Sequence, residues 1–125
     1  MKLVDTSSWI EQLRHDGDVV VRERVEMLLV TGEAAWCPVV RLELWNGARG
    51  DREHAVLREM EKELPCLEIT AAVWDDAAET ARLARQSGLT IPVTDLLVSA
   101  CARHHGLSLE HNDSHFARIA ALPAR

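Results

Sequence analysis

Four acidic residues give this sequence its clearest chemical signal. Asp5, Asp95 and Asp113 each follow a short apolar segment and precede or open a predicted helix, and Glu43 lies inside a predicted helix. Any one aspartate at a helix start could simply accept hydrogen bonds from free backbone amides and gain roughly 0.3–1 kcal/mol from the helix dipole. Glu43 does not fit that explanation, because it lies in mid-helix and has no cation at helical spacing.

None of these four carboxylates has a lysine or arginine three or four residues downstream. Other acids do, since Glu59 precedes Lys62 and Glu79 precedes Arg82 at spacings that pair on a helix. Four unpaired carboxylates gathered in a partly buried crevice would raise one another's pKa unless cations were bound. Carboxylate oxygens suit Mg²⁺ or Mn²⁺, and such ions activate water for in-line attack on phosphate. The acids therefore predict a metal-dependent site that cleaves phosphodiester bonds.

Apolar spacing and capping residues predict how the chain positions these acids. Short strands are predicted at residues 2–4, 34–37, 66–69 and 107–109. Helices are predicted after Asp5 with hydroxyls at residues 6–8 as caps, from Asp18 to the stop at Gly32, and at 39–48, 51–64, 71–86, 96–102 and after Asp113. Strands that alternate with helices predict an α/β sandwich around a parallel sheet. In such a sheet, sites form beyond the carboxyl ends of the strands, where the acids would meet.

Length and composition predict one globular domain that spans residues 1–125, without an internal repeat or linker. Hydrophobic residues make up 47% of the chain and charged residues 27%, and no apolar run is long enough to cross a bilayer. The net charge of −6 argues against a broad basic surface for nucleic acid. It does not exclude a nuclease, because bound cations would reverse the local potential.

The cellular compartment is predicted from the first residues and the cysteines. The N-terminus reaches Asp5 after two apolar residues and so lacks the apolar core of a secretory signal. Cys37, Cys66 and Cys101 form no C-x-x-C pair, and their apolar context favours buried, reduced thiols over disulfides. Both features favour the cytoplasm.

Four short blocks of the chain resemble the conserved blocks of PIN-domain ribonucleases. They are residues 4–7 (VDTS), 40–44 (VRLEL), 94–100 (TDLLVSA) and 112–116 (NDSHF), and each contains one of the four acids. Their order and spacing fit from Asp5 to the last predicted helix, and the chain most resembles the single-domain VapC-type toxins of prokaryotic toxin–antitoxin pairs. The resemblance implies a three-layer α/β/α sandwich with a central, mostly parallel sheet.

The resemblance also implies a metal-dependent endoribonuclease that is the toxin of such a pair. It assigns the binding of Mg²⁺ or Mn²⁺, and water-mediated cleavage of single-stranded or looped cellular RNA, to Asp5, Glu43, Asp95 and Asp113. Thr6 and Thr94 would orient these carboxylates by hydrogen bonds. The implied partners are RNA, a second copy of the chain in a homodimer, and a small antitoxin whose tail covers the active site.

One position departs from the family pattern. Many members carry a further acidic residue two positions after the fourth carboxylate, where this chain has His115. The departure bears on a second metal site and on the pH optimum. It also allows another interpretation, in which His111, Asp113 and His115 share one face of a strand and bind zinc, although the sequence places no further imidazole or thiol there.

Other residues are candidates for contact with a substrate. Aromatic side chains stack on unpaired bases but more often fill a core or an interface, and the candidates are Trp9, Trp36, Trp45 and Trp74. The basic residues nearest the predicted crevice are Arg14, Arg41, Arg49 and Arg103, for which a solvated surface is the simpler interpretation. The imidazoles of His104 and His105 would interact with the carboxyl end of the predicted buried helix.

Two other functions fit the same fold class. A receiver-like phosphoacceptor also places an aspartate at the end of a strand, but it needs a cluster of acids near the first strand and a lysine late in the chain. No lysine follows Lys62. A catalytically silent binding module on the same fold is the second alternative, and the retention of all four acids argues against it.

Overall fold

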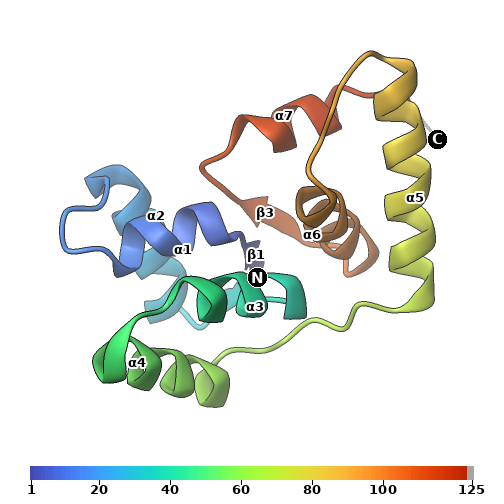
Figure 1. Ribbon diagram of the computed structural model, residues 1–125. Coiled ribbons are helices and arrows are strands. Elements are labelled where there is room, and N and C mark those ends of the chain that lie inside the picture. Colours follow the sequence, from blue (N-terminus) through green and yellow to red (C-terminus); the bar gives the residue numbers. More distant parts are fainter. Residues whose placement is uncertain (124–125) are drawn as a thin grey trace.

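The computed structural model describes residues 1–123, in which helices surround a small sheet (Figure 1). The elements follow in the order β1 (Lys2–Val4), α1 (Thr6–Leu13), α2 (Val19–Val30), β2 (Ala34–Ala35), α3 (Pro38–Gly47), α4 (Gly50–Glu63), α5 (Ala71–Gln86), α6 (Val93–His104), β3 (Ser108–Glu110) and α7 (Ser114–Ala120). The prediction of an α/β fold is confirmed, with helix as the dominant element.

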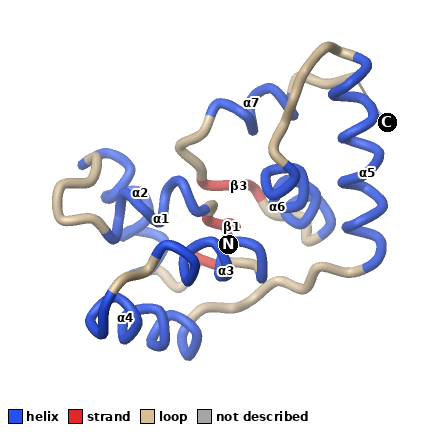
Figure 2. Tube along the Cα trace, in the orientation of Figure 1, coloured by secondary structure: helices blue, strands red, loops and turns tan. Residues whose placement is uncertain are grey.

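The three strands form one parallel sheet in the order β2–β1–β3. Leu3 of the central strand lies opposite Ala35 on one side and opposite Leu109 on the other. Leu3 and Val4 are fully buried, and Figure 2 shows the strands in the middle of the molecule with α1, α3 and α6 around them. Because all three strands run in the same direction, their carboxyl ends meet at one edge of the sheet.

The helices pack in pairs that cover this sheet. Helix α5 packs against α6, α1 packs on α2 and α3, and α7 packs on α6 (Figure 1). Every residue from Asp95 to Ala102 of α6 is buried, as predicted for that segment, although the helix starts earlier and ends later than predicted. The face of α5 that packs into the core includes Val73, Ala77 and Ala84, which are buried.

The predicted strand at residues 66–69 is wrong. Cys66 makes a single parallel bridge to Trp36, and the remaining residues run as a loop towards α5. The neighbouring strand β2 is also shorter than predicted. Pro38 opens α3 three residues after the end of β2, and a proline has no N–H with which to continue a ladder.

The residues that cap the helices agree with the prediction in part. Asp18 caps α2 by accepting a hydrogen bond from the Val21 amide at 3.0 Å, as predicted. The hydroxyls of residues 6–8 do not cap α1, because Asp5 accepts from the Ser7 amide instead. Gly32 follows the end of α2 with a φ of 71°, a left-handed conformation that suits the predicted stop.

Two further predictions concern thiols and membranes. Cys37 and Cys101 are buried and all three cysteines are free, as expected, but Cys66 is exposed, because its segment is a loop at the surface. The hydrogen bond with Cys101, and after it burial, raise the pKa of the Cys37 thiol, so this sulfur stays protonated. Among the described helices, none is both long enough and apolar enough to cross a membrane.

Candidate active site

The carboxyl edge of the sheet gathers the four predicted acids. Asp5 directly follows β1, and its amide donates to the carbonyl of Glu110 at the end of β3 at 2.9 Å. Asp113 follows β3 and caps α7, Glu43 lies on α3 after β2, and Asp95 lies in the first turn of α6. Four segments that are far apart in sequence therefore deliver one carboxylate each to the same edge.

Asp5 is held by the residue two positions after it. Its Oδ2 atom accepts from the amide of Ser7 at 3.0 Å and from the hydroxyl of Ser7 at 2.7 Å. The same hydroxyl accepts from the amide of Asn112 at 2.9 Å. Ser7 thus ties the end of β1 to the loop that carries Asp113, and only 3% of Asp5 is exposed. The sequence suggested only a capping role for Ser7.

Glu43 reaches the cluster from α3. Its Oε1 atom accepts a hydrogen bond from the hydroxyl of Thr6 at 2.8 Å, across 37 residues of sequence. Thr6 therefore makes the kind of bond that was expected of it. Thr94 does not: within residues 1–123 its hydroxyl has no hydrogen-bond partner, although it directly precedes Asp95 in α6.

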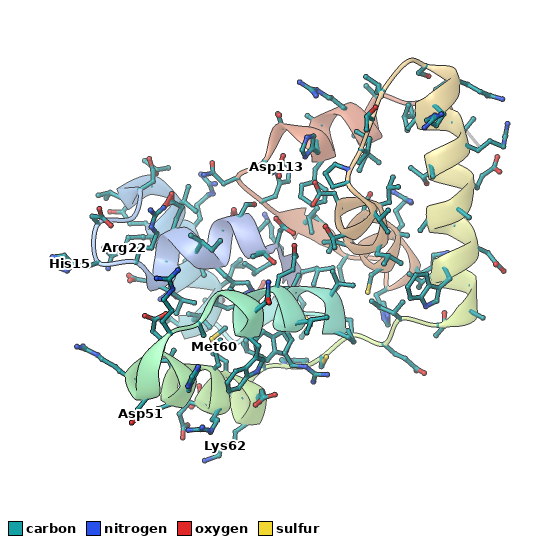
Figure 3. The ribbon with its side chains drawn as sticks, in the orientation of Figure 1. His15, Arg22, Asp51, Met60, Lys62 and Asp113 are labelled. Carbon is teal, nitrogen blue, oxygen red and sulfur yellow. The ribbon has the colours of Figure 1, made fainter. Side chains whose placement is uncertain are left out.

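Asp95 and Asp113 meet at the imidazole of His115. The Nδ1 atom of His115 lies 2.8 Å from Oδ2 of Asp95 and 3.0 Å from Oδ1 of Asp113. The amide of His115 also donates to Oδ1 of Asp113 at 2.9 Å, which is the capping bond of α7. Figure 3 shows Asp113 where the chain enters α7, well away from the labelled residues of α4.

The pKa values show that these carboxylates share one electrostatic environment. Burial is the largest cause that raises the pKa of Asp5, of Glu43 and of Asp95. The charge of Asp113 raises the pKa of Asp5 further, and the charges of Asp5 and Asp95 do the same for Glu43. Hydrogen bonds from Ser7, Thr6 and His115 act in the opposite direction. Mutual repulsion is expected only if the four acids lie close together.

The donor set suits a divalent cation. Single ligand atoms of Asp95, Asp113 and His115 all lie within 4.8 Å of one another. Two ligands on opposite sides of an octahedral ion, each about 2.1 Å from it, stand about 4.2 Å apart, so little movement would bring these atoms onto one ion. The charge of Asp5 raises the pKa of Asp95, and the charges of Asp5 and Asp95 raise the pKa of Glu43. Bound cations would relieve this repulsion.

The predicted zinc group is not assembled. His111 lies outside the cluster, with its ring against that of Phe116 at a centroid distance of 5.0 Å. Its Nδ1 atom accepts from the amide of Asp113 at 3.3 Å. The backbone turns into α7 at Asp113, so residues 111–115 do not form the strand that this reading required.

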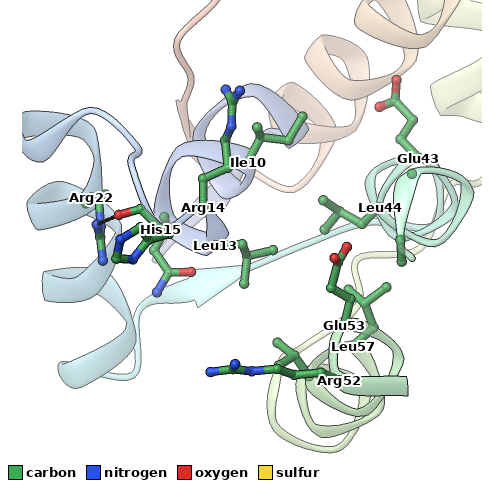
Figure 4. Close-up of a pocket in the computed structure, with 14 residues that line it drawn as sticks. Ile10, Leu13, Arg14, His15, Arg22, Glu43, Leu44, Arg52, Glu53 and Leu57 are labelled. Atoms are coloured by element: carbon green, nitrogen blue, oxygen red, sulfur yellow. Dashed lines mark hydrogen bonds between the residues drawn. The ribbon is translucent and has the colours of Figure 1, made fainter. Parts of the chain in front are cut away.

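A groove of about 810 Å³ adjoins the acidic cluster and runs between α1, α3 and α4. Its apolar wall includes Leu13, Leu44 and Leu57. Figure 4 shows Leu13 and Leu44 on opposite sides of the groove, with Glu43 at the rim and directed away from its floor. Arg14, Arg22 and Arg52 line the same groove, so its walls combine apolar and cationic side chains.

The other candidate contacts are distributed differently. Trp9 and Trp36 are buried in the core, and Trp45 is stacked on His54, so only Trp74 is largely exposed. Arg14 lines the groove. The charge of Arg41 lowers the pKa of the Cys66 thiol, against the larger effect of burial. Arg49 is the N-cap residue of α4. The Arg103 guanidinium donates hydrogen bonds to Asp76, Ser99 and Thr80. His104 and His105 contact Asp76 and the Glu68 carbonyl beyond the end of α6.

A further buried acid, Glu110, was not predicted from the sequence. Glu110 ends β3 with 6% exposure and accepts from the Ser8 hydroxyl at 2.7 Å and from Arg24 at 2.8 and 3.2 Å. The bonds from Arg24 and Ser8 outweigh burial and lower the pKa of Glu110. This pair braces β3 against α1 and α2, directly behind Asp5. No local spacing signals it, because Arg24 lies 86 residues before Glu110.

The fold and the site together define an α/β protein with an acidic cluster at the carboxyl edge of a parallel sheet. Comparison with known proteins names the family, because the sequence model of the PIN domain matches residues 2–122. The chain belongs to the PIN-domain family. The prediction drawn from the four sequence blocks is confirmed.

Several known proteins are similar to this chain over nearly its whole length. Ribonuclease VapC11 of Mycobacterium tuberculosis is 35% identical over 98% of this chain and 93% of the relative. Ribonuclease VapC21 of the same organism is 32% identical over 82% and 76%. The solved structure of DNA-bound VapBC from Salmonella typhimurium has a TM-score of 0.78 at 21% identity, covering 95% of this chain and 93% of that chain.

A second solved structure has the same fold. It is VapC20 of Mycobacterium tuberculosis, described as a toxin that cleaves the sarcin–ricin loop, with a TM-score of 0.71 at 22% identity and coverage of 98% and 97%. At these low identities the two structures show the fold alone, whereas the curated relatives connect the chain to VapC ribonucleases.

Proposed function

We propose that this chain is a metal-dependent endoribonuclease and the toxin of a toxin–antitoxin pair, acting in the cytoplasm as a single PIN domain over residues 1–125. The observation that carries the proposal is the meeting of Asp5, Glu43, Asp95 and Asp113 at the carboxyl edge of the sheet. Burial and the charges of neighbouring acids raise the pKa values of Asp5, Glu43 and Asp95, and Asp113 supplies part of the charge that acts on Asp5 and Asp95. The similarity to VapC ribonucleases supports RNA as the substrate.

The residues have distinct roles in this proposal. The four acids would hold Mg²⁺ or Mn²⁺, which would polarise the phosphate and lower the pKa of the attacking water. Ser7 fixes the orientation of Asp5 by two hydrogen bonds, and Thr6 fixes that of Glu43. Such bonds keep carboxylate oxygens directed into the site and reduce the reorganisation that binding would require.

We also propose that the groove beside Glu43 holds a segment of the cognate antitoxin. Leu13 and Val56 are 41% and 42% exposed there and would cover the apolar side of an amphipathic helix, while the arginines along the groove would bind acidic side chains. A segment seated in this groove lies next to Glu43, so it would block the approach of RNA to the acids.

The groove proposal has a direct test. Leu13→Glu should release the ribonuclease from inhibition by its antitoxin and leave free-enzyme cleavage unchanged, because Leu13 lies in the groove and outside the acidic cluster. Val30→Glu is the control, since Val30 is 85% exposed at the end of α2 and does not line the groove. Unchanged inhibition of the Leu13→Glu variant would contradict this location.

A homodimer is proposed on the resemblance to VapC-type toxins. Leu42, Trp74 and Val93 are 70%, 54% and 67% exposed, and such large apolar side chains are available for an interface. Light scattering of the purified protein across a concentration series measures the mass directly. A monomer at all concentrations would reject the homodimer without affecting the site.

Cleavage of total RNA by purified, antitoxin-free protein tests the main proposal. Reactions with Mg²⁺, with Mn²⁺ and with EDTA should show discrete fragments only when metal is present. Asp5→Asn should abolish cleavage in a folded protein, whereas Asp75→Asn, an exposed aspartate on α5, should leave it intact. Absence of cleavage with either metal would instead favour a silent binding module. Full activity of the Asp5→Asn variant would reject the assignment of Asp5 to the metal site.

A further inference from the structure

His115 differs from the partners of the other acids because it contacts two carboxylates of the cluster. Elsewhere, Glu110 is paired with the Arg24 guanidinium, and Asp76 is paired with Arg103 and with the His104 imidazole. Within the described residues 1–123, by contrast, the ion-pair partner of both Asp95 and Asp113 is the imidazole of His115. An imidazole differs from a guanidinium in one decisive way, because its ring nitrogen can bind a metal ion.

The distances around His115 are those of ligands that share one ion. Two adjacent ligands about 2.1 Å from an octahedral cation stand about 3.0 Å apart. The Nδ1 atom of His115 lies 2.8 Å from Oδ2 of Asp95 and 3.0 Å from Oδ1 of Asp113. Its side chain is 30% exposed, and its amide is anchored to Asp113 by the capping bond of α7, which fixes the ring beside both carboxylates.

We propose that Nδ1 of His115 is itself a ligand of the divalent ion held by Asp95 and Asp113, and that this nitrogen shifts the preference of the site from Mg²⁺ towards Mn²⁺. The inference rests on the proposed metal site and specifies its chemistry. Mg²⁺ prefers oxygen ligands, whereas first-row transition metals also accept imidazole. A carboxylate in place of His115 would complete an all-oxygen set and favour Mg²⁺.

Pulsed electron paramagnetic resonance of the Mn²⁺-loaded, full-length protein tests the ligand directly. A bound imidazole nitrogen couples to the electron spin of Mn²⁺, and we expect this coupling in the wild-type protein. His115→Ala should abolish it. His111→Gln should retain it, because His111 is the neighbouring imidazole and lies outside the cluster. Coupling that survives in His115→Ala, or Mn²⁺ bound without any nitrogen coupling, would overturn the proposal.

Calorimetric titration with Mg²⁺ and Mn²⁺ tests the selectivity. We expect His115→Ala to weaken Mn²⁺ binding by about tenfold and Mg²⁺ binding by no more than about threefold. His115→Asp restores an oxygen ligand and should reverse the order of preference, which keeps the test decisive if the alanine variant folds poorly. A gain in affinity for both metals in His115→Ala would mean that the imidazole only occupies the carboxylates, and it would overturn the proposal.

The two proposals can fail separately. If Mn²⁺ binds and Asp95→Asn removes that binding, the carboxylate site stands whatever the nitrogen signal shows. If Mn²⁺ does not bind, or binds equally well to Asp95→Asn, the metal site itself is rejected and the role of His115 with it.

Discussion

Replacing Asp95 with asparagine should abolish RNA cleavage and yet stabilise the metal-free protein. The substitution keeps the shape of the side chain and leaves an oxygen that can accept a hydrogen bond from His115. It removes one charge that is costly in the folded state, because burial raises the pKa of Asp95 and the charges of Asp113 and Asp5 raise it further. An ionised carboxyl with a raised folded-state pKa destabilises the folded protein at neutral pH.

The size of the effect follows from the geometry. The facing ligand atoms of Asp95 and Asp113 lie within 4.8 Å, a distance at which two unit charges repel by about 3.5 kcal/mol at an effective dielectric constant of about 20. Exposure of Asp113 reduces that repulsion, and the lost interaction of Asp95 with the dipole of α6 costs roughly 0.3–1 kcal/mol. We expect a net gain of about 1 kcal/mol, or about 4 °C in Tm for a domain of this size.

Thermal melts in EDTA at neutral pH measure this gain, with the same melts in Mg²⁺ beside them. Wild-type protein should be stabilised by Mg²⁺, and Asp95→Asn should not respond. Asp51→Asn is a matched control, because Asp51 is an exposed aspartate in the first turn of α4 and loses the same helix-dipole interaction. An Asp95→Asn variant that melts at or below the wild-type temperature in EDTA would refute the reasoning about charge repulsion.

Three further outcomes are expected. Glu43→Gln removes a charge but keeps an oxygen for the Thr6 hydroxyl, so it should also raise the Tm of the metal-free protein. It should weaken Mg²⁺ binding in calorimetry. A melt without a gain in Tm would place Glu43 outside the cluster. The metal-free wild type should lose stability relative to Asp95→Asn as pH rises above about 4. A carboxyl whose pKa is raised in the folded state contributes its full stability below its unfolded-state pKa, and this contribution is lost as pH rises through its folded-state pKa. Denaturant melts in EDTA that give the same pH dependence of stability for both proteins would contradict this. Arg24→Gln should lower the free energy of unfolding by about 1 kcal/mol. Because Arg24 lowers the pKa of Glu110, the full loss should be seen above pH about 4.3 and should become smaller as pH falls further. A loss that is independent of pH in urea melts would reject the ion pair as its source.

Glu43 shows what a sequence can reveal about such a site. It was singled out because no cation lies at helical spacing from it, and the structure gives it a partner, Thr6, from another helix. The aspartates were equally consistent with simple capping, and Asp5 and Asp113 do cap α1 and α7. Capping and clustering are not alternatives here, because both require an acid where a strand gives way to a helix.

The parts that escaped prediction depend on contacts between distant segments. Glu110 looks like an ordinary strand residue until β3 is placed beside β1, which brings it to Ser8 and Arg24. The loop around Cys66 has the composition of a strand, but the segment beside it turns into α3 at Pro38, so the ladder stops after one bridge. Composition and periodicity describe one segment at a time. They therefore predict neither the contacts of Glu110 nor the end of the ladder at Cys66.

The two groups of buried acid explain why the site should bind cations at all. Glu110 is matched by Arg24, and its pKa falls. The neighbouring acids Asp5, Glu43 and Asp95 have no guanidinium among the residues described, and their pKa values rise. Among the described residues, the protein thus pairs Glu110 with an arginine and gives the cluster at the edge of the sheet only hydroxyls and the His115 imidazole. A metal at about one hundred times its Kd would stabilise the folded state by about 2.7 kcal/mol. Binding and stability are therefore coupled through the same carboxylates that we assign to catalysis.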